Sequence, residues 1–487
     1  MRRPSHYPDN PSKLWDFFWD FTQTPRPSKQ EEQISRYVKE YAKSHGLECL
    51  ADNVGNLVIR VPGSPGRESE PGVIIQNHLD MVTDAVPGKK IDFSKDPIEV
   101  TVSEGYLRSV DTTLGADNGI GCCAALALIE ACEDHPPLEL LFTVDEETGL
   151  GGALGLDPSL LRYKKLINLD SEDWGVFYIG CAGGKDFELT GKVETNTVPA
   201  NFQAFQIEIG GLLGGHSGID IHRGRANAIK ELALFLAGIR SEYSLVEFVG
   251  GKAHNIIPRD ASCVIVGDQV LEQELGVWGE KFLGSLEGRF PEEFGSLKFE
   301  ISEADTPSEC VNASEGLRMV QLANIFPHGA HEFDWRQTSD VLTSVSNNLA
   351  RFILKNGEVY FQTSCRAMDE GDYLPLVRQI EILAKQNHLN CAERVGYPGW
   401  APIFDGELLK RAVDVYFDIH GEKPDVRAIH AGLECGILNE KLGGIESLSF
   451  GPIIQGAHSP SERVEIESVA KFWNLLIEIM KVKNIGA

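Results

Sequence analysis

The sequence lacks any continuous stretch of about 18 apolar residues, which is the length that a membrane-spanning helix needs. Its first residues, Met1-Arg2-Arg3-Pro4, are not followed by the apolar segment that marks a secretory signal. Internal repeats and low-complexity tracts are missing as well. We therefore expect a globular chain in the cytoplasm, with no membrane span and no export signal.

Cysteines are present, but they lack the spacing of a zinc ribbon or a redox pair. The ten cysteines are scattered, Cys122 and Cys123 are adjacent, and no C-x-x-C pair occurs. Spacing of this kind is typical of reduced, buried thiols and not of a disulfide framework.

Positive charge is scarce. The 487 residues contain 45 Lys and Arg against 72 Asp and Glu, which gives a formal net charge of −27. Such a surface repels nucleic acid and anionic membranes, so neither is expected as a partner. The hydrophobic content of 42% and charged content of 24% are those of a globular protein, and the length allows two or three domains.

Near the N-terminus, two helices are predicted. Residues 11–21 are rich in aromatic side chains and favour the first helix. Ser28-Lys29-Gln30-Glu31 has the pattern of a capping box, which predicts a second helix reaching roughly to His45. Ile34 and Val38 would lie on its buried face.

Residues 72–82 are the stretch around which the rest of the chain is organised. The apolar, β-branched start of this stretch predicts a buried strand of a parallel sheet. The strand ends in His78-x-Asp80, and side chains two residues apart point to the same side. A metal-binding imidazole needs such a carboxylate to fix its second nitrogen. Taken alone, a His-x-Asp pair at a strand end is more often an ordinary polar edge, and the residues downstream are what favour the metal site.

Two further acidic side chains stand at the ends of predicted elements. Asp117 precedes a helix of small residues expected over 120–131, where it could also be an ordinary N-cap. Asp170 ends the predicted strand 166–170. In an open α/β sheet, functional sites lie at the carboxyl ends of the strands, which is where both carboxylates would be.

Downstream, a run of acids and a histidine follow the same rule. Asp145, Glu146 and Glu147 follow the predicted strand 138–144, and three adjacent carboxylates repel one another unless they are separated or neutralised. A surface turn or a metal cluster would relieve this repulsion. His458 follows the β-rich segment 445–454.

Five positions thus share one pattern, an imidazole or a carboxylate at the end of a strand or the start of a helix. They are His78, Asp117, Glu147, Asp170 and His458. Two imidazoles and three carboxylates suit a pair of divalent ions such as Zn²⁺, Mn²⁺ or Co²⁺, with one carboxylate bridging them. A remaining carboxylate beside the site could act as general base on metal-bound water, which is the arrangement of a two-metal hydrolase.

At these positions the chain resembles the aminoacyl-histidine dipeptidases, also called Xaa-His dipeptidase, peptidase D or bacterial carnosinase. They belong to the wider co-catalytic zinc aminoacylase and carboxypeptidase clan. The resemblance runs nearly end to end, in the family's motif order. It is carried by residues 76–82, 113–121, 146–149, 168–172, 181–184, 214–218, 255–259, 397–400, 430–436 and 457–460.

The resemblance implies a role for each metal-site residue. His78 and Asp170 would hold one ion, and Glu147 and His458 the other. Asp117 would bridge the two ions, with a cis peptide bond to the next residue. Asp80 would orient His78, while Glu146 would be the general base and then the proton donor to the leaving amine.

The resemblance also implies the domain organisation. Residues 184–399 would form an inserted α+β domain that acts as a lid and dimerisation domain. The segments 1–183 and 400–487 would form the catalytic domain, with a mixed, mostly parallel sheet flanked by helices. A homodimer is therefore expected.

Within the insert, Gly214-Gly215-His216-Ser217-Gly218 is the most distinctive motif. As a phosphate-binding loop it fails, because no Lys follows the glycines. The resemblance implies that His216 stabilises the oxyanion, from its own or the partner subunit's site; a tight glycine turn is the alternative. Asn255, Arg259 and His430 are candidates for holding the substrate, although an ion pair for Arg259 and a core position for His430 are equally reasonable.

The sequence therefore predicts a metallopeptidase that cleaves dipeptides with histidine in second position, such as β-Ala-His. Two zinc ions, or manganese or cobalt, would be its cofactors, and a metal-bound water would be its nucleophile. The alternatives are a related aminoacylase or aminopeptidase on the same scaffold, and a metal-binding relative without activity. The presence of Glu146 argues against the last alternative, because an inactive relative would lose its base first.

Overall fold

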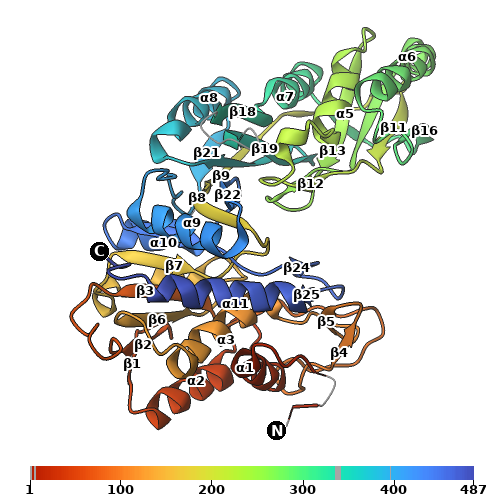
Figure 1. The fold of residues 1–487 in the computed structure, drawn as a ribbon. Helices are drawn as coiled ribbons and strands as arrows, with labels where there is room; N and C mark the ends of the chain where they lie inside the picture. The colour runs from red at the N-terminus through yellow and green to blue at the C-terminus, as the bar shows by residue number, and fades with distance from the viewer. Residues whose placement is uncertain (1–2, 5–6, 335–341, 395) are drawn as a thin grey trace. The chain divides into compact units, whose positions relative to one another are not determined.

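The computed structural model describes residues 3–4, 7–334, 342–394 and 396–487. These residues form two compact units (Figure 1). The first comprises Met1–Cys181, Trp400–Ala428 and Leu433–Ala487, and the second comprises Ala182–Gly399 and Ile429–Gly432. The short segment Ile429–Gly432, which carries His430, thus belongs to the second unit although it lies in the part of the sequence expected to be catalytic.

An eight-stranded mixed sheet forms the centre of the first unit. Its order is β1 (Glu48–Ala51), β2 (Leu57–Val61), β6 (Leu138–Thr143), β3 (Val73–His78), β7 (Lys165–Asn168), β23 (Glu446–Ser449), β8 (Val176–Cys181) and β22 (Asp425–Ile429). The central strands β6, β3, β7 and β23 are parallel, whereas β1, β2 and β8 pair in antiparallel fashion. The central strands therefore all end at one edge of the sheet.

Helices flank this sheet. They are α1 (Ser12–Gln23), α2 (Glu32–Ser44), α3 (Ala116–Ala131), α4 (Gly151–Gly155), η1 (Pro158–Leu160), α9 (Glu407–His420), α10 (Glu434–Lys441) and α11 (Ile466–Lys481). Helix α11 contacts both α3 and α9, so these three lie side by side (Figure 1). The predicted α/β class, a mixed sheet flanked by helices, is confirmed. Among the helices of the described residues, none combines the length and the hydropathy that crossing a bilayer requires.

Burial explains why β3 and α3 form where they do. Every residue of β3 is buried, because strands lie on both its sides and helices cover the sheet. Helix α3 consists largely of Ala, Gly and Cys and is buried on nearly all sides, so it packs close to β3. Small side chains here bring the start of α3 near the end of β3.

The expected capping box at the start of α2 does not form. Glu31 occupies the N-cap position without a side-chain capping bond. The hydroxyl of Ser28 instead donates to Asp80 Oδ2 at 2.8 Å. A distant buried carboxylate thus outweighs the local capping interaction, and that part of the prediction was wrong.

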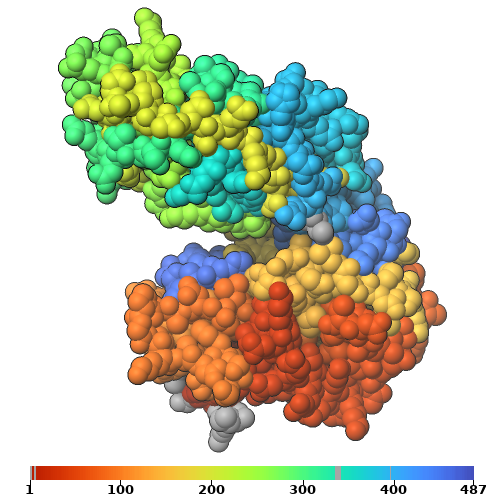
Figure 2. Space-filling model, turned by 180° about the vertical axis from the view of Figure 1, so that it is seen from behind, coloured from red at the N-terminus to blue at the C-terminus, as the bar shows by residue number. Residues whose placement is uncertain are grey.

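A small four-stranded sheet joins segments from the two separate parts of the sequence that make up the first unit. Its order is β24 (Ile454–Gln455), β25 (Arg463–Glu465), β5 (Tyr106–Ser109) and β4 (Val100–Ser103). In the space-filling view, the blue C-terminal residues accordingly lie against the orange ones (Figure 2). The pairing of β25 with β5 fixes the loop that carries His458.

The second unit is built on a nine-stranded sheet in which neighbouring strands pair in antiparallel fashion. Its order is β16 (Lys298–Ala304), β11 (Gln203–Gly210), β15 (Ala261–Gly267), β13 (Tyr243–Gly250), β19 (Leu342–Lys355), β20 (Glu358–Ala367), β9 (Gly183–Lys192) and β21 (Asn390–Glu393), with β18 (Gly329–Asp334) also on β19. Two small sheets add β10 (Thr195–Thr197) with β17 (Glu309–Val311), and β12 (Gly215–His216) with β14 (Ile256–Ile257).

Apolar side chains of the helices pack against this sheet. The helices are α5 (Ala228–Ala237), α6 (Gln269–Arg289), α7 (Ala313–Ile325) and α8 (Leu374–Gln386), with the short turns η2 (Ile221–Arg223) and η3 (Glu370–Tyr373). Phe235 of α5 and Phe282 of α6 meet edge to face with ring centroids 5.2 Å apart. Both rings belong to one hydrophobic core, so the second unit has its own core.

Candidate metal centre

The carboxyl ends of β3, β6 and β7 bring three of the predicted ligands to one edge of the sheet. His78 is the last residue of β3, Asp170 follows β7 and Glu147 follows β6. His78 Nε2 lies 3.3 Å from Asp170 Oδ1. This proximity follows directly from the parallel pairing of β3 with both neighbours.

Asp117 lies between the two predicted ligand histidines. Its Oδ1 is 3.1 Å from His78 Nε2, and its Oδ2 is 3.1 Å from His458 Nε2. Glu147 Oε2 lies 2.9 Å from the same nitrogen of His458. Two of the three groups of possible ligands among the described residues contain Asp117, namely His78–Asp117–Asp170 and Asp117–Glu147–His458, each with its ligand atoms within 4.8 Å of one another; the third is His78–Glu146–Glu147. Asp117 is common to the first two groups.

The donor atoms of this cluster fit a pair of divalent cations. Imidazole nitrogen with carboxylate oxygen is the ligand chemistry of Zn²⁺, Mn²⁺ and Co²⁺. Within the described residues, Glu147 Oε1 is buried without a hydrogen-bond partner, as expected for an oxygen that a cation would bind. His78 is buried and His458 is exposed, so the cluster is fixed on one side and accessible on the other.

Charges within the cluster stabilise one another. Hydrogen bonds with Asp117 and Glu147 raise the pKa of His458 to about 11. Burial opposes the charged form of His78, but Asp170 and Asp117 outweigh it and raise the pKa of this imidazole well above its ordinary value. The carboxylates therefore favour cationic partners at both histidine positions.

Asp80 connects the end of β3 with the acidic turn after β6. Its carboxylate accepts the backbone N–H of Glu146 at 3.0 Å and that of Glu147 at 3.2 Å. His78 Nδ1 lies 3.5 Å from Asp80 Oδ1, so the ring turns Nε2 towards Asp117. Asp80 thus orients an imidazole and two acids at once.

Glu146 stands beside the cluster. Burial raises the pKa of its carboxyl well above the ordinary value, and neighbouring carboxylates add to the shift. Glu146 and Glu147 both come within ligand range of His78. Among the described residues, Glu147 also forms an ion pair with His458, whereas Glu146 does not.

The start of α3 is shaped around Asp117. The Asp117–Asn118 peptide bond is cis, as the family resemblance implies. Asn118 Nδ2 donates to Leu169 O at 2.7 Å. Gly121 lies so close to Asn77 and to the Leu169 carbonyl that any Cβ there would clash. Asp117 itself lies inside the boundaries of α3 with non-helical dihedral angles and does not act as its N-cap.

Sequence reasoning missed three buried charged residues around the cluster, Arg26, Glu434 and Glu462. Glu434 Oε2 accepts from Gln76 Nε2 at 2.5 Å and from Thr143 Oγ1 at 2.7 Å, beneath the ends of β3 and β6. The only signal for Glu462 was its position four residues after His458. Arg26 carried no signal in a single sequence.

The other predicted site residues belong to the second unit. His216 is in β12, and its Nδ1 accepts the backbone N–H groups of Gly218 and Ile219, each at 3.2 Å. With Nδ1 as acceptor, the neutral ring carries its proton on Nε2. Asp220 Oδ2 accepts the His216 N–H at 2.9 Å. The glycine-rich loop is therefore an ordered turn that fixes the tautomer of His216.

The three candidates for substrate binding differ in their contacts. Asn255 accepts the Ser217 N–H through its backbone oxygen at 2.8 Å. Arg259 is exposed, and its Nε donates to Leu212 O at 2.8 Å. Burial lowers the pKa of His430 to about 3, and Arg366 contributes, so His430 is neutral at pH 7.

His430 Nε2 lies 2.7 Å from Ser346 Oγ. Arg366, which sequence reasoning also missed, donates to the Tyr397 hydroxyl at 2.6 Å. A neutral His430 can offer a substrate a hydrogen bond but no charge.

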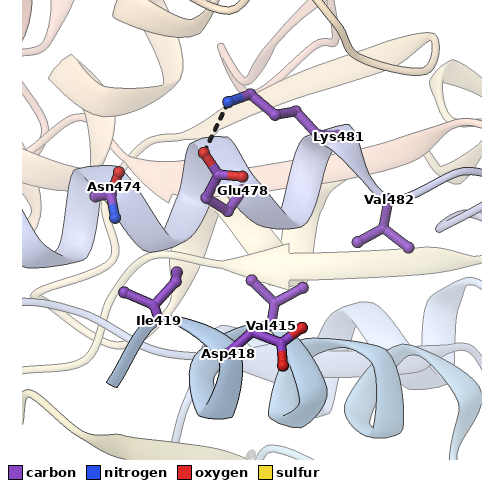
Figure 3. A pocket seen from close by; sticks show the side chains of 7 residues that line it. All are labelled: Val415, Asp418, Ile419, Asn474, Glu478, Lys481 and Val482. Carbon is purple, nitrogen blue, oxygen red and sulfur yellow. Dashed lines mark hydrogen bonds and ion pairs between the residues drawn. The ribbon is translucent and has the colours of Figure 1, made fainter. Parts of the chain in front are cut away.

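A surface hollow of about 500 Å³ lies between α9 and α11. Its lining includes Val415, Ile419 and Val482, together with Glu478 and Lys481, which form an ion pair at 2.7 Å (Figure 3). No imidazole or thiol lines it. This hollow does not have the donor set of the cluster around Asp117.

Known proteins are similar to this chain in sequence and in fold. The profile of peptidase family M20/M25/M40 matches residues 74–482. The cytosol non-specific dipeptidase of Escherichia coli strain K12 is 35% identical over 483 residues, covering 97% of this chain and 98% of the relative. The crystal structure of aminoacylhistidine dipeptidase from Vibrio alginolyticus has a TM-score of 0.88 at 33% identity and covers 97% of both chains. Aminopeptidase PepT from Bacillus cereus ATCC 10987 shares the fold at 17% identity, with a TM-score of 0.56 over 98% and 99% of the chains.

Proposed function

The chain belongs to peptidase family M20/M25/M40 and hydrolyses peptide bonds, and we propose that its substrates are dipeptides, with a preference for histidine in second position. The similarity to the two dipeptidases supports the substrate class, and the observation that carries the two-metal mechanism is the placement of Asp117, whose two carboxylate oxygens face His78 and His458 separately. A carboxylate shared in this way suits a bridging ligand between two cations.

In this proposal His78 and Asp170 would hold one divalent ion, Glu147 and His458 would hold the other, and Asp117 would be shared by both. Zinc is the proposed metal, with manganese and cobalt as alternatives. When bound, the two metal ions would supply Lewis acidity, which polarises the scissile carbonyl and makes water more acidic. Asp80 keeps His78 turned towards the ions through its contact with Nδ1.

Glu146 is the proposed general base. It takes a proton from the attacking water and returns it to the leaving amine, which requires a carboxylate close to the ligands but not engaged by His458. His216 contributes its Nε2–H to the developing oxyanion, from the same or the partner subunit of a homodimer. Asn255, Arg259 and His430 are proposed to hold the substrate, and the second unit to act as the lid and dimerisation domain.

The names of the two most informative relatives differ in specificity, since one is a non-specific dipeptidase and the other an aminoacylhistidine dipeptidase. The name of the former also supports a cytosolic location. A panel of β-Ala-His, Ala-His, Ala-Leu and Ala-Ala tests the preference, with an N-acetylated amino acid as the control for aminoacylase activity. We expect higher kcat/KM for the histidine dipeptides. Equal values across the panel would refute the preference while leaving dipeptidase activity intact.

Metal dependence is tested separately. Treatment with chelator should abolish hydrolysis, and added Zn²⁺, Mn²⁺ or Co²⁺ should restore it, with two ions per chain by elemental analysis. Full activity in a sample verified to be free of metal would refute the proposal. Stoichiometric metal without hydrolysis of any peptide in the panel would instead indicate a metal-binding relative.

A further inference from the structure

The loop that carries Asp117 is held on one side by a single buried carboxylate. Glu462 Oε2 accepts the backbone N–H groups of Leu114 and Gly115 at 2.7 and 2.9 Å. Its Oε1 accepts those of Ala116 and Asp117 at 2.7 and 3.3 Å. Four consecutive amides therefore converge on one side chain that is only 2% exposed.

A buried guanidinium holds the same loop from another direction. Arg26 Nη2 donates to the carbonyl oxygen of Gly115. Its Nη1 donates to Leu79 O at 3.0 Å and to Asp80 O at 2.9 Å. Arg26 is also 2% exposed, so its N–H groups donate to these backbone carbonyls and not to bulk water.

Two glycines make room for this guanidinium. A Cβ at Gly115 or at Gly119 would collide with Arg26 Nη2. Gly115 also has a φ of 72°, in the left-handed region that favours glycine. In the sequence these two glycines suggest only the start of a helix, but in the structure they leave room for the side chain of a residue about 90 positions earlier.

The two charged residues together connect the chain segments that carry three proposed ligands. Glu462 lies four residues beyond His458 and accepts the backbone N–H of Asp117. Arg26 connects the same loop to the backbone on the C-terminal side of His78. Asp117 faces both histidines at 3.1 Å, and a shift of less than 1 Å would disturb both contacts.

We propose that Arg26 and Glu462 are positioning residues, which clamp the backbone of loop 114–117. The clamp would keep one carboxylate oxygen of Asp117 directed to each of the two proposed metal positions. This inference rests on the proposed metal function of the cluster. Removing either partner leaves several buried backbone groups unsatisfied and frees Asp117 to move. Because Asp117 is shared, the binding of both ions should weaken together.

Cobalt binding tests this proposal without relying on activity. Metal-free full-length protein is titrated with Co²⁺, and bound metal and the visible absorption spectrum are recorded. Glu462→Gln keeps the size of the side chain but places an amide NH₂ against backbone donors. Arg26→Lys keeps the charge but cannot reach three carbonyls. Outer partners of metal ligands typically affect affinity by about 10–100-fold, and we expect that loss with an altered spectrum for each variant.

Three control variants match these changes. Glu467→Gln and Arg36→Lys alter exposed residues in the same way. Val469→Ala removes buried methyl groups from α11 and lowers stability without removing any hydrogen bond to the loop, so it controls for general destabilisation. Urea unfolding of each metal-free variant records its stability. We expect all three controls to bind Co²⁺ like the wild type, with Val469→Ala alone among them shifting the unfolding midpoint.

The outcomes separate the two levels of inference. Wild-type protein that binds no Co²⁺ would refute the proposed metal function, and the clamp with it. Wild-type binding with unchanged affinity and spectrum in Glu462→Gln and Arg26→Lys would overturn the clamp alone. If Val469→Ala weakened Co²⁺ binding as much as the clamp variants did, the effect would be one of stability and the positioning role would be refuted. Should one clamp variant fail to fold, the other decides.

Discussion

Glu146 and Glu147 offer a matched pair of substitutions, because the two side chains are adjacent and their backbones are held by the same carboxylate. Asp80 accepts one N–H from each of them, at 3.0 and 3.2 Å. Substitution by Gln leaves these backbone contacts in place and changes only one side-chain oxygen to NH₂. Different outcomes must therefore come from what each side chain does.

The structure predicts that the two variants fail differently. Glu147 Oε2 is 2.9 Å from His458 Nε2, and its other oxygen is buried without a hydrogen-bond partner in the described part of the chain. Glu147→Gln removes the charge of a proposed ligand, so we expect fewer than two ions per chain. Glu146→Gln should retain both ions and lose proton transfer, a step worth about 10²–10⁴-fold in kcat. This loss corresponds to a barrier increase of about 2.7–5.4 kcal/mol.

Elemental analysis and kcat for β-Ala-His, measured on the same preparations, distinguish the two cases. Urea unfolding of both variants serves as the control, because similar midpoints exclude loss of structure as the cause. Metal loss in Glu146→Gln together with full metal content in Glu147→Gln would show that the assignments are exchanged. Unchanged kcat in Glu146→Gln would remove Glu146 from the mechanism altogether.

Two further predictions concern the second unit. His216→Ala should lower kcat about 10²–10³-fold at unchanged metal content, because it removes one donor to the oxyanion; wild-type kcat would reduce the loop to a structural turn. If the site is shared, mixing His216→Ala with Glu146→Gln protein should restore activity as subunits exchange. Since burial lowers the pKa of His430 to about 3, the unfolded chain takes up this proton first, so the contribution of His430 to stability is complete above about pH 6.5 and declines as the pH falls towards 3. We expect the free energy of unfolding, measured with urea between about pH 7.5 and 5, to fall more steeply with decreasing pH in wild type than in His430→Gln, by up to about 1.4 kcal/mol per pH unit. The same pH dependence in both proteins would contradict this.

The parts of the fold that follow from local patterns were predictable. The apolar run that ends at His78 forms β3, and the run before the acidic turn forms β6. Both are central strands, where burial on both faces leaves an unbroken apolar pattern. Once two such strands are parallel neighbours, the residues that follow them must meet at one edge, which is why His78 and Glu147 could be grouped before their distance was known.

Contacts that depend on tertiary structure were not predictable. The capping box at Ser28 does not form because the Ser28 hydroxyl donates to Asp80, a buried carboxylate more than 50 residues away. Glu31, the expected partner of Ser28, accepts the backbone N–H of Asp145 instead at 3.0 Å. Local propensity for a cap is worth about 1 kcal/mol, and a buried charge in need of donors outweighs it.

Glu462 and Arg26 could not be identified from the sequence for a different physical reason. Their partners are backbone groups, and every residue other than proline has those, so no residue type on the other side of the contact marks them. Metal ligands come from a few residue types, chiefly His, Asp, Glu and Cys, and hence can be read from a sequence, whereas the backbone that positions them is held by contacts that only the fold creates. Here one carboxylate that accepts four amides and one guanidinium that donates to three carbonyls surround the loop of Asp117. The geometry of the proposed metal centre would then depend on residues whose chemistry, taken alone, suggests nothing more than an ion pair at the surface.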